Sequence, residues 1–154
     1  MTIMLGVGKR GVMAKSKIAV GDTDSLIALV CKEDANHIKA KNISKWLLSQ
    51  GYEVVYPNTA ILETITTLKR ALNLPDKAEL VNTRYLQGTL SIEYIDEKIQ
   101  KLASQRFSRT NSKKNTIFDA IVAETAVELG AEYIFSFDSW YSKEGFKLVV
   151  ANLD

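Results

Sequence analysis

The sequence contains one cysteine, Cys31, and one histidine, His37, among its 154 residues. A single cysteine excludes an intramolecular disulfide, and one cysteine with one histidine is too few for a Cys/His zinc site. No apolar run approaches the roughly 20 residues that cross a bilayer, and the first residues lack the apolar core and cleavage site of a secretory signal. We therefore expect a cytoplasmic protein without a membrane segment, and any metal chemistry must rest on carboxylates.

Proline is also scarce, with 2 residues, and the 8 glycines form no low-complexity segment. The chain is long enough for one hydrophobic core and short for two, so we expect a single domain at 17–154. Residues 1–16 are rich in glycine and lysine, which predicts a flexible extension, and Met13 offers an alternative translation start to Met1. The letters GVGKRG fit a dinucleotide-binding pattern, but a strand-like run follows instead of the required helix.

From residue 18 onward, short apolar runs alternate with stretches of helical periodicity. The expected strands are 18–21, 52–57, 89–94, 131–137 and 146–151, and the expected helices are 24–33, 34–51, 58–74, 76–87, 94–107 and 116–130. A polar turn is expected at 138–145. Strands separated by helices predict the α/β class, with a central parallel sheet of four to five strands and helices on both faces.

In such a sheet, ligands bind beyond the carboxyl ends of the strands. Asp22 and Asp24 follow the first expected strand, and Asp138 follows the strand at 131–137. Glu63 and Asp119 stand in helical stretches with little other charge. Each acid also has a structural interpretation, because Asp22, Asp24 or Asp138 can cap a helix and Asp119 follows Thr116 at capping-box spacing.

Taken together, the acids favour a metal site over a set of caps. Magnesium and manganese bind oxygen ligands, and a few carboxylates gathered at one point supply them. Carboxylates clustered without a cation repel one another and raise their own pKa values, so such a cluster is poor for stability.

Three blocks, DTDSLIALV, NTAILETITTLKRAL and FDAIVAETAVELGAEYIFSFDSWY, resemble the signature blocks of the PIN-domain family. The likeness is greatest to the VapC-type toxin ribonucleases of toxin–antitoxin pairs, and it runs from about Ile18 to Val150. The resemblance implies that Asp22, Glu63, Asp119 and Asp138 are the catalytic acids and hold Mg²⁺ or Mn²⁺. Thr23, Asp24 and Ser136 are then expected to orient the carboxylates or water. Asp24 and Tyr141 depart from the family's usual residues, and Asp24 is expected to cap the helix rather than to bind metal.

The resemblance further implies an endoribonuclease that hydrolyses RNA phosphodiester bonds, forms a homodimer and is neutralised by an antitoxin protein. The segment 98–114 carries six basic residues and no acidic one. We expect its side chains Arg106, Arg109, Lys113 and Lys114 to bind the RNA backbone. A solvated helix face with a charged loop is the alternative interpretation of this segment.

Three other functions stay open. The first is a PIN nuclease in RNA processing or repair that has no antitoxin. The second is a haloacid-dehalogenase-like phosphotransferase with Asp22 as nucleophile, although that family has a later paired-acid block and FSFDSWY offers a single acid. The third is a non-catalytic interaction protein, which a missing acid would have indicated.

Overall fold

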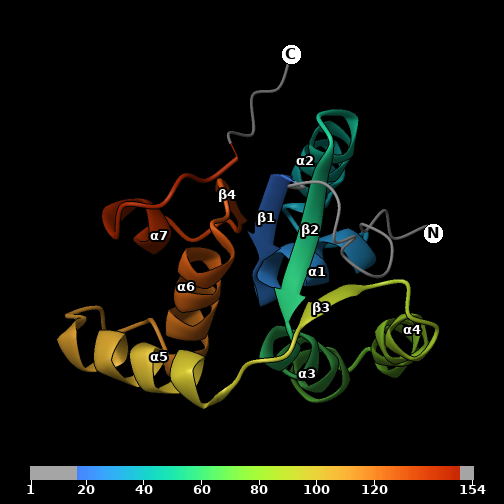
Figure 1. The fold of residues 1–154 in the computed structure, drawn as a ribbon. Helices are drawn as coiled ribbons and strands as arrows, with labels where there is room; N and C mark the ends of the chain where they lie inside the picture. The colour runs from blue at the N-terminus through green and yellow to red at the C-terminus, as the bar shows by residue number, and fades with distance from the viewer. Residues whose placement is uncertain (1–16, 150–154) are drawn as a thin grey trace.

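The computed structural model describes residues 17–149, and the predicted extension at 1–16 lies outside this range. A four-stranded sheet with the order β3-β2-β1-β4 forms the centre of the molecule (Figure 1). All three strand pairs are parallel, as predicted. The strands are β1 (Lys17–Gly21), β2 (Tyr52–Pro57), β3 (Ser91–Glu93) and β4 (Tyr133–Phe135).

Helices connect the strands, as the alternating pattern predicts. They are α1 (Thr23–Val30), α2 (His37–Ser49), α3 (Asn58–Thr66), α4 (Pro75–Leu86), α5 (Glu97–Arg109), α6 (Ile117–Leu129) and α7 (Trp140–Lys143), with a π-helix, η1 (Thr67–Ala71), after α3. None of the helices in this part of the chain is long and apolar enough to span a membrane.

Two hydrophobic clusters cover the two faces of the sheet. Ala19 of β1 points into the larger cluster, together with apolar side chains of α1, α2, α3 and α4. Val20 points the other way, into a cluster with α6 and α7. Successive strand residues face opposite sides, so a fully buried strand must be apolar at both positions. This burial explains why the first strand reads as an apolar run.

The close approach of Gly21 to Tyr56 fixes the end of β1. A Cβ atom at Gly21 would lie 2.2 Å from Cε1 of the Tyr56 ring, so no larger residue fits there without moving the ring. Tyr56 is itself fully buried in β2. Glycine therefore allows β1 and β2 to end side by side, directly before Asp22.

The structure differs from the sequence prediction in two places near the C-terminus. The segment 138–145, expected as a turn, contains the short helix α7, which begins where Asp138 Oδ1 accepts the Trp140 backbone N–H at 2.9 Å. The expected strand at 146–151 is reduced, within the described part, to one parallel bridge between Leu148 and Ile134. The buried rings of Trp140 and Tyr141 hold the helix against the core, an effect that local sequence does not encode.

Candidate active site

The carboxyl ends of β1 and β4 bring three aspartates to one edge of the sheet. The backbone N–H of Asp22 donates to the Phe135 carbonyl at 3.1 Å, which joins the two strand ends. Asp24 lies in the first turn of α1, and Asp138 follows β4. The acids at the two strand ends thus share one region, as the rule for parallel sheets predicts.

Asp22 is the most enclosed of these acids, with 6% of its surface exposed. Its Oδ1 accepts the Thr23 backbone N–H at 2.7 Å, so Asp22 is the N-cap of α1. Its Oδ2 accepts the Tyr141 hydroxyl at 2.8 Å. Burial, followed by the nearby charges of Asp24 and Asp119, raises the pKa of Asp22 well above its usual value. Asp22 therefore caps a helix and also belongs to a cluster of like charges.

Asp24 contacts the segment after β4 and does not cap α1. Its Oδ2 accepts the Phe137 backbone N–H at 2.9 Å and the Ser136 hydroxyl at 3.0 Å. Its Oδ1 is buried and has no hydrogen-bond partner within residues 17–149. Burial is the main cause that raises the pKa of Asp24 to about 6. Asp24 thus positions the chain that leads to Asp138 and leaves one oxygen unsatisfied.

Glu63 reaches the same region from α3. Its Oε1 accepts a hydrogen bond from the Thr23 hydroxyl, which connects α3 to the start of α1. Partial burial, with a smaller contribution from the Asp119 charge, raises the pKa of Glu63. Thr23 is thus the hydrogen-bond donor to Glu63, and its orienting role stays a prediction.

Asn115 links the remaining two acids. Its side-chain amide Nδ2 donates to Asp119 Oδ2 at 3.1 Å and to Asp138 Oδ2 at 2.9 Å. Asp119 also closes a capping box with Thr116 at the start of α6, with its Oδ2 2.9 Å from the Thr116 backbone nitrogen. Burial raises the pKa of Asp119, and the charge of Asp138 adds to this effect. Asp119 therefore has the capping role that its spacing suggested and also lies beside Asp138.

The donor chemistry of this cluster fits Mg²⁺ or Mn²⁺. The acids supply only oxygen atoms, they raise one another's pKa values, and Asp24 has a buried oxygen without a partner. A hard divalent cation neutralises such a group. The acids do not form a closed ligand set, because among residues 17–149 no group of three or more His, Cys, Asp or Glu side chains is arranged to hold a metal ion. Hydrogen bonds from Asn115 and Tyr141 occupy several of the carboxylate oxygens instead.

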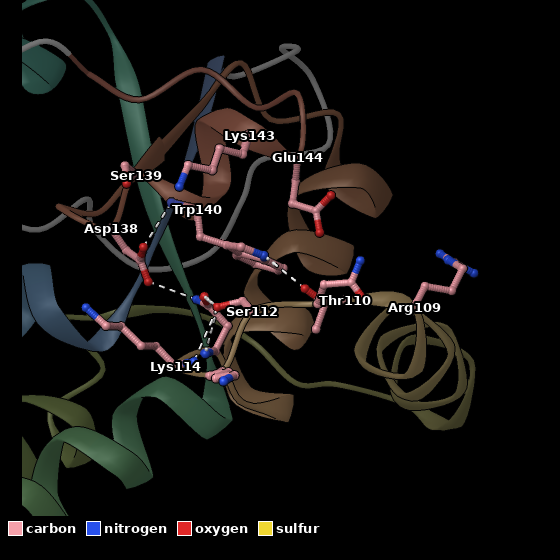
Figure 2. Close-up of a pocket in the computed structure, with 12 residues that line it drawn as sticks. Arg109, Thr110, Ser112, Lys114, Asp138, Ser139, Trp140, Lys143 and Glu144 are labelled. Atoms are coloured by element: carbon pink, nitrogen blue, oxygen red, sulfur yellow. Dashed lines mark hydrogen bonds between the residues drawn. The ribbon is translucent and has the colours of Figure 1, made fainter.

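Three of the four predicted RNA-binding residues border this site. Arg109, Lys113 and Lys114 line a pocket that also includes Asp138 (Figure 2). Arg106 is placed differently, because its Nε lies 2.7 Å from Glu124 Oε1 in a largely buried ion pair between α5 and α6.

Two residues of the site, Tyr141 and Asn115, were not predicted from the sequence. Tyr141 donates to Asp22 and lies 3.5 Å from Asp119 Oδ1, and Asn115 bridges Asp119 and Asp138. The only signal for Tyr141 was its departure from the family's usual residue, and Asn115 gave none beyond its place just before Thr116. His37 has a structural contact, since its Nδ1 lies 2.7 Å from the Ala28 carbonyl oxygen.

Several solved structures share this fold. VapC20 of Mycobacterium tuberculosis, described as a sarcin-ricin loop cleaving toxin, superposes with a TM-score of 0.74 at 23% identity, covering 86% of this chain and 98% of that one. VapBC2 of Rickettsia felis, bound to a promoter DNA fragment, has a TM-score of 0.63 at 12% identity, with 86% and 97% covered. FitAcB of Neisseria gonorrhoeae has a TM-score of 0.62 at 16% identity, with 88% and 99% covered. No curated protein matches the sequence.

A family model tests the resemblance independently of these structures. The model of the PIN domain matches residues 19–146. This range contains all four predicted catalytic acids, and it also contains Asn115 and Tyr141, each of which contacts two of them. The chain therefore belongs to the PIN domain family.

Proposed function

We propose that this protein is a metal-dependent endoribonuclease whose active site consists of Asp22, Glu63, Asp119 and Asp138. One observation supports this most strongly. The Tyr141 hydroxyl lies within 3.5 Å of both Asp22 and Asp119, and the Asn115 amide within 3.1 Å of both Asp119 and Asp138. Tyr141 therefore bridges Asp22 and Asp119, and Asn115 bridges Asp119 and Asp138. These three acids come from separate segments and meet at the edge where ligands bind in a parallel sheet.

The four acids would hold Mg²⁺ or Mn²⁺, which, when bound, activates water and offsets the negative charge of the attacked phosphate. The chain's own contribution is to fix the acids before the ion arrives. Thr23 orients Glu63, while Ser136 and Tyr141 orient Asp22. Arg109, Lys113 and Lys114 would attract the RNA backbone to the same edge.

Cleavage of single-stranded RNA by the purified protein tests this function. We expect cleavage with Mn²⁺ or Mg²⁺, none with EDTA, and a loss of at least 100-fold in Asp22→Asn and Asp119→Asn. Asp76→Asn is the matched control, because Asp76 is an exposed acid in the first turn of α4. The same variants are compared by thermal unfolding with and without Mn²⁺, which reports metal binding without activity.

A wild-type protein that neither cleaves RNA nor gains thermal stability from Mn²⁺ would reject the nuclease and favour the non-catalytic interaction protein. The haloacid-dehalogenase-like alternative has less support. The PIN domain model matches residues 19–146, and the sequence has a single acid in FSFDSWY where the haloacid-dehalogenase family has a paired-acid block.

We further propose that the protein is the toxin of a toxin–antitoxin pair. The structural neighbours support this, because two of them are the complexes VapBC2 and FitAcB. Expression of the wild type should stop growth of the host, and co-expression of the neighbouring gene's product should restore it. Growth arrest that no neighbouring product relieves would favour the PIN nuclease without an antitoxin. The predicted homodimer is tested by light scattering of the purified chain, and the cytoplasmic location stays a prediction.

A further inference from the structure

A pocket of about 650 Å³ opens beside the candidate active site. One wall is the segment 109–115, which joins α5 to α6, and the other is the segment 138–144, which includes α7. Figure 2 shows these two segments facing each other, with the side chains of Lys114 and Lys143 extending from the two sides. Pockets that bind small ligands are of this size.

The pocket carries an excess of positive charge. Four cationic side chains line it, against the carboxylates of Asp138 and Glu144; the cations are Arg109, Lys113, Lys114 and Lys143. None of these four forms an ion pair with another residue between 17 and 149. Hydroxyl and amide groups make up much of the rest of the lining, so the pocket suits an anion that also accepts and donates hydrogen bonds.

Hydrogen bonds within and between the two walls fix their shape. The Trp140 indole N–H donates to the Thr110 hydroxyl at 3.2 Å, which ties α7 to the end of α5. The Ser112 hydroxyl donates to Asn115 Oδ1 at 2.5 Å, and the amide of Asn115 in turn contacts Asp138. The pocket is therefore preformed, and it is continuous with the catalytic cluster through Asn115 and Asp138.

We propose that this pocket binds the phosphate and sugar of an RNA nucleotide next to the cleaved bond, with Lys114 and Lys143 as its main phosphate contacts. The proposal rests on the proposed nuclease function, because Asp138 belongs to both sites. It adds Lys143, which lies outside the basic segment 98–114, to the surface that contacts RNA. A phosphate chain entering the catalytic edge would pass between two basic walls, and the nearest nucleotide would fill the space between them.

The test measures binding of a fluorescent single-stranded RNA oligonucleotide to the full chain in EDTA, over a series of salt concentrations. Lys114→Gln/Lys143→Gln removes one cation from each wall of the pocket. Asn111→Trp adds bulk to the pocket lining without changing its charge, and Asn111 is an exposed loop residue. Lys39→Gln/Lys45→Gln is the matched control, because these two lysines are exposed on α2.

We expect the pocket double variant to bind RNA at least fivefold more weakly, with a salt slope lower by about 1.4, from about 0.7 per phosphate contact. Asn111→Trp should also weaken binding, whereas the α2 control should bind as the wild type does. Wild-type affinity in both pocket variants would overturn the proposal, as would a wild type that does not bind RNA.

Hydrolysis of bis(p-nitrophenyl) phosphate by the wild type with Mn²⁺ separates this proposal from the proposed function. This small diester has no flanking nucleotide, so it reports the carboxylate cluster alone. Failure to cleave both the diester and RNA, together with RNA binding that the pocket variants weaken, would reject the nuclease and leave the pocket as an RNA-binding site.

Discussion

The Ser136 hydroxyl donates a hydrogen bond to Asp24 Oδ2 at 3.0 Å and so connects the chain after β4 to the first turn of α1. Ser136 Oγ also lies 3.3 Å from Asp22 Oδ2, and it accepts a hydrogen bond from the backbone N–H of Asp138 at 3.1 Å. One buried side chain therefore touches three of the acids at this edge of the sheet. Tyr141 and Asn115 each contact two of these acids through their side chains, so Ser136 is the strongest candidate for a positioning residue.

Replacing Ser136 by alanine should therefore disturb the active site without removing an acid. Loss of a hydrogen bond that orients metal ligands typically costs 10- to 100-fold in metal affinity or activity. We expect Ser136→Ala to lower RNA cleavage by about this factor and to require more Mn²⁺ for half-maximal activity. Ser136→Thr keeps the hydroxyl and should retain most of the activity. Equal Mn²⁺ dependence in wild type and Ser136→Ala would contradict a positioning role.

Asp24 should make the metal-free protein less stable as the pH rises. Burial raises its pKa from 3.8 to about 6, so between these values the folded state binds more protons than the unfolded state. The free energy of unfolding then falls as pH increases through this range. At about 1.4 kcal/mol per pKa unit, the ionised carboxylate costs the folded state on the order of 3 kcal/mol at pH 7.5.

Asp24→Asn removes this charge and keeps an oxygen that can accept the Phe137 N–H. Urea unfolding in EDTA should show that Asp24→Asn is more stable than the wild type by about 1–3 kcal/mol at pH 7.5. The difference should fall to about a third of that at pH 4.5, because the carboxyl of the unfolded chain, with its pKa of 3.8, is still mostly ionised there. Asp76→Asn serves as the control for removal of an exposed acid. An Asp24→Asn protein that is no more stable than the wild type at pH 7.5 would show that the Asp24 charge is compensated.

Sequence periodicity was sufficient for the order of the parallel strands and the connecting helices, because apolar runs alternate along the chain with stretches that have one apolar helical face. It was not sufficient for α7, where DSWYSKEG is mostly polar and the helix depends on burial of Trp140 and Tyr141 against α6. The reduced final strand has a similar cause. Leu148 reaches β4 through a single bridge, and an apolar run alone does not reveal how many ladder contacts the chain can form.

Asp22, Asp119 and Asp138 could be predicted because they follow strand ends or begin a helix, whereas Glu63 lies inside α3 and was predicted from the family resemblance. The neutral side chains that contact these acids could not all be predicted. Tyr141 lies 119 residues from Asp22 in the chain, and a local sequence pattern does not indicate such a distant contact. The basic segment 98–114 shows the same limit. Its arginines look equivalent in sequence, but Arg109 lines the pocket and Arg106 pairs with Glu124.

Asn115 should compete with a metal ion for the acids that it bridges. Its amide occupies Oδ2 of both Asp119 and Asp138, and a hydrogen bond to a charged group contributes about 1.5–3 kcal/mol. Asn115→Ala should lower the free energy of unfolding in EDTA and should gain more thermal stability from Mn²⁺ than the wild type does. Asn111→Ala, in the same loop, is the control. A smaller Mn²⁺ gain in Asn115→Ala would mean that the amide helps to hold the ion.

Arg106 should act on stability rather than on RNA binding. Its ion pair with Glu124 is largely buried, with 17% and 8% of the two side chains exposed, and its guanidinium lies 5.4 Å from the centre of the Phe146 ring. Arg106→Gln leaves Glu124 charged, buried and unpaired, which should cost about 3 kcal/mol of unfolding free energy. Arg106→Gln/Glu124→Gln removes both charges and should recover much of that loss. RNA affinity, measured where both variants are folded, should stay near the wild-type value. A several-fold loss of RNA affinity in the double variant would instead place Arg106 among the RNA contacts, as the sequence alone suggested.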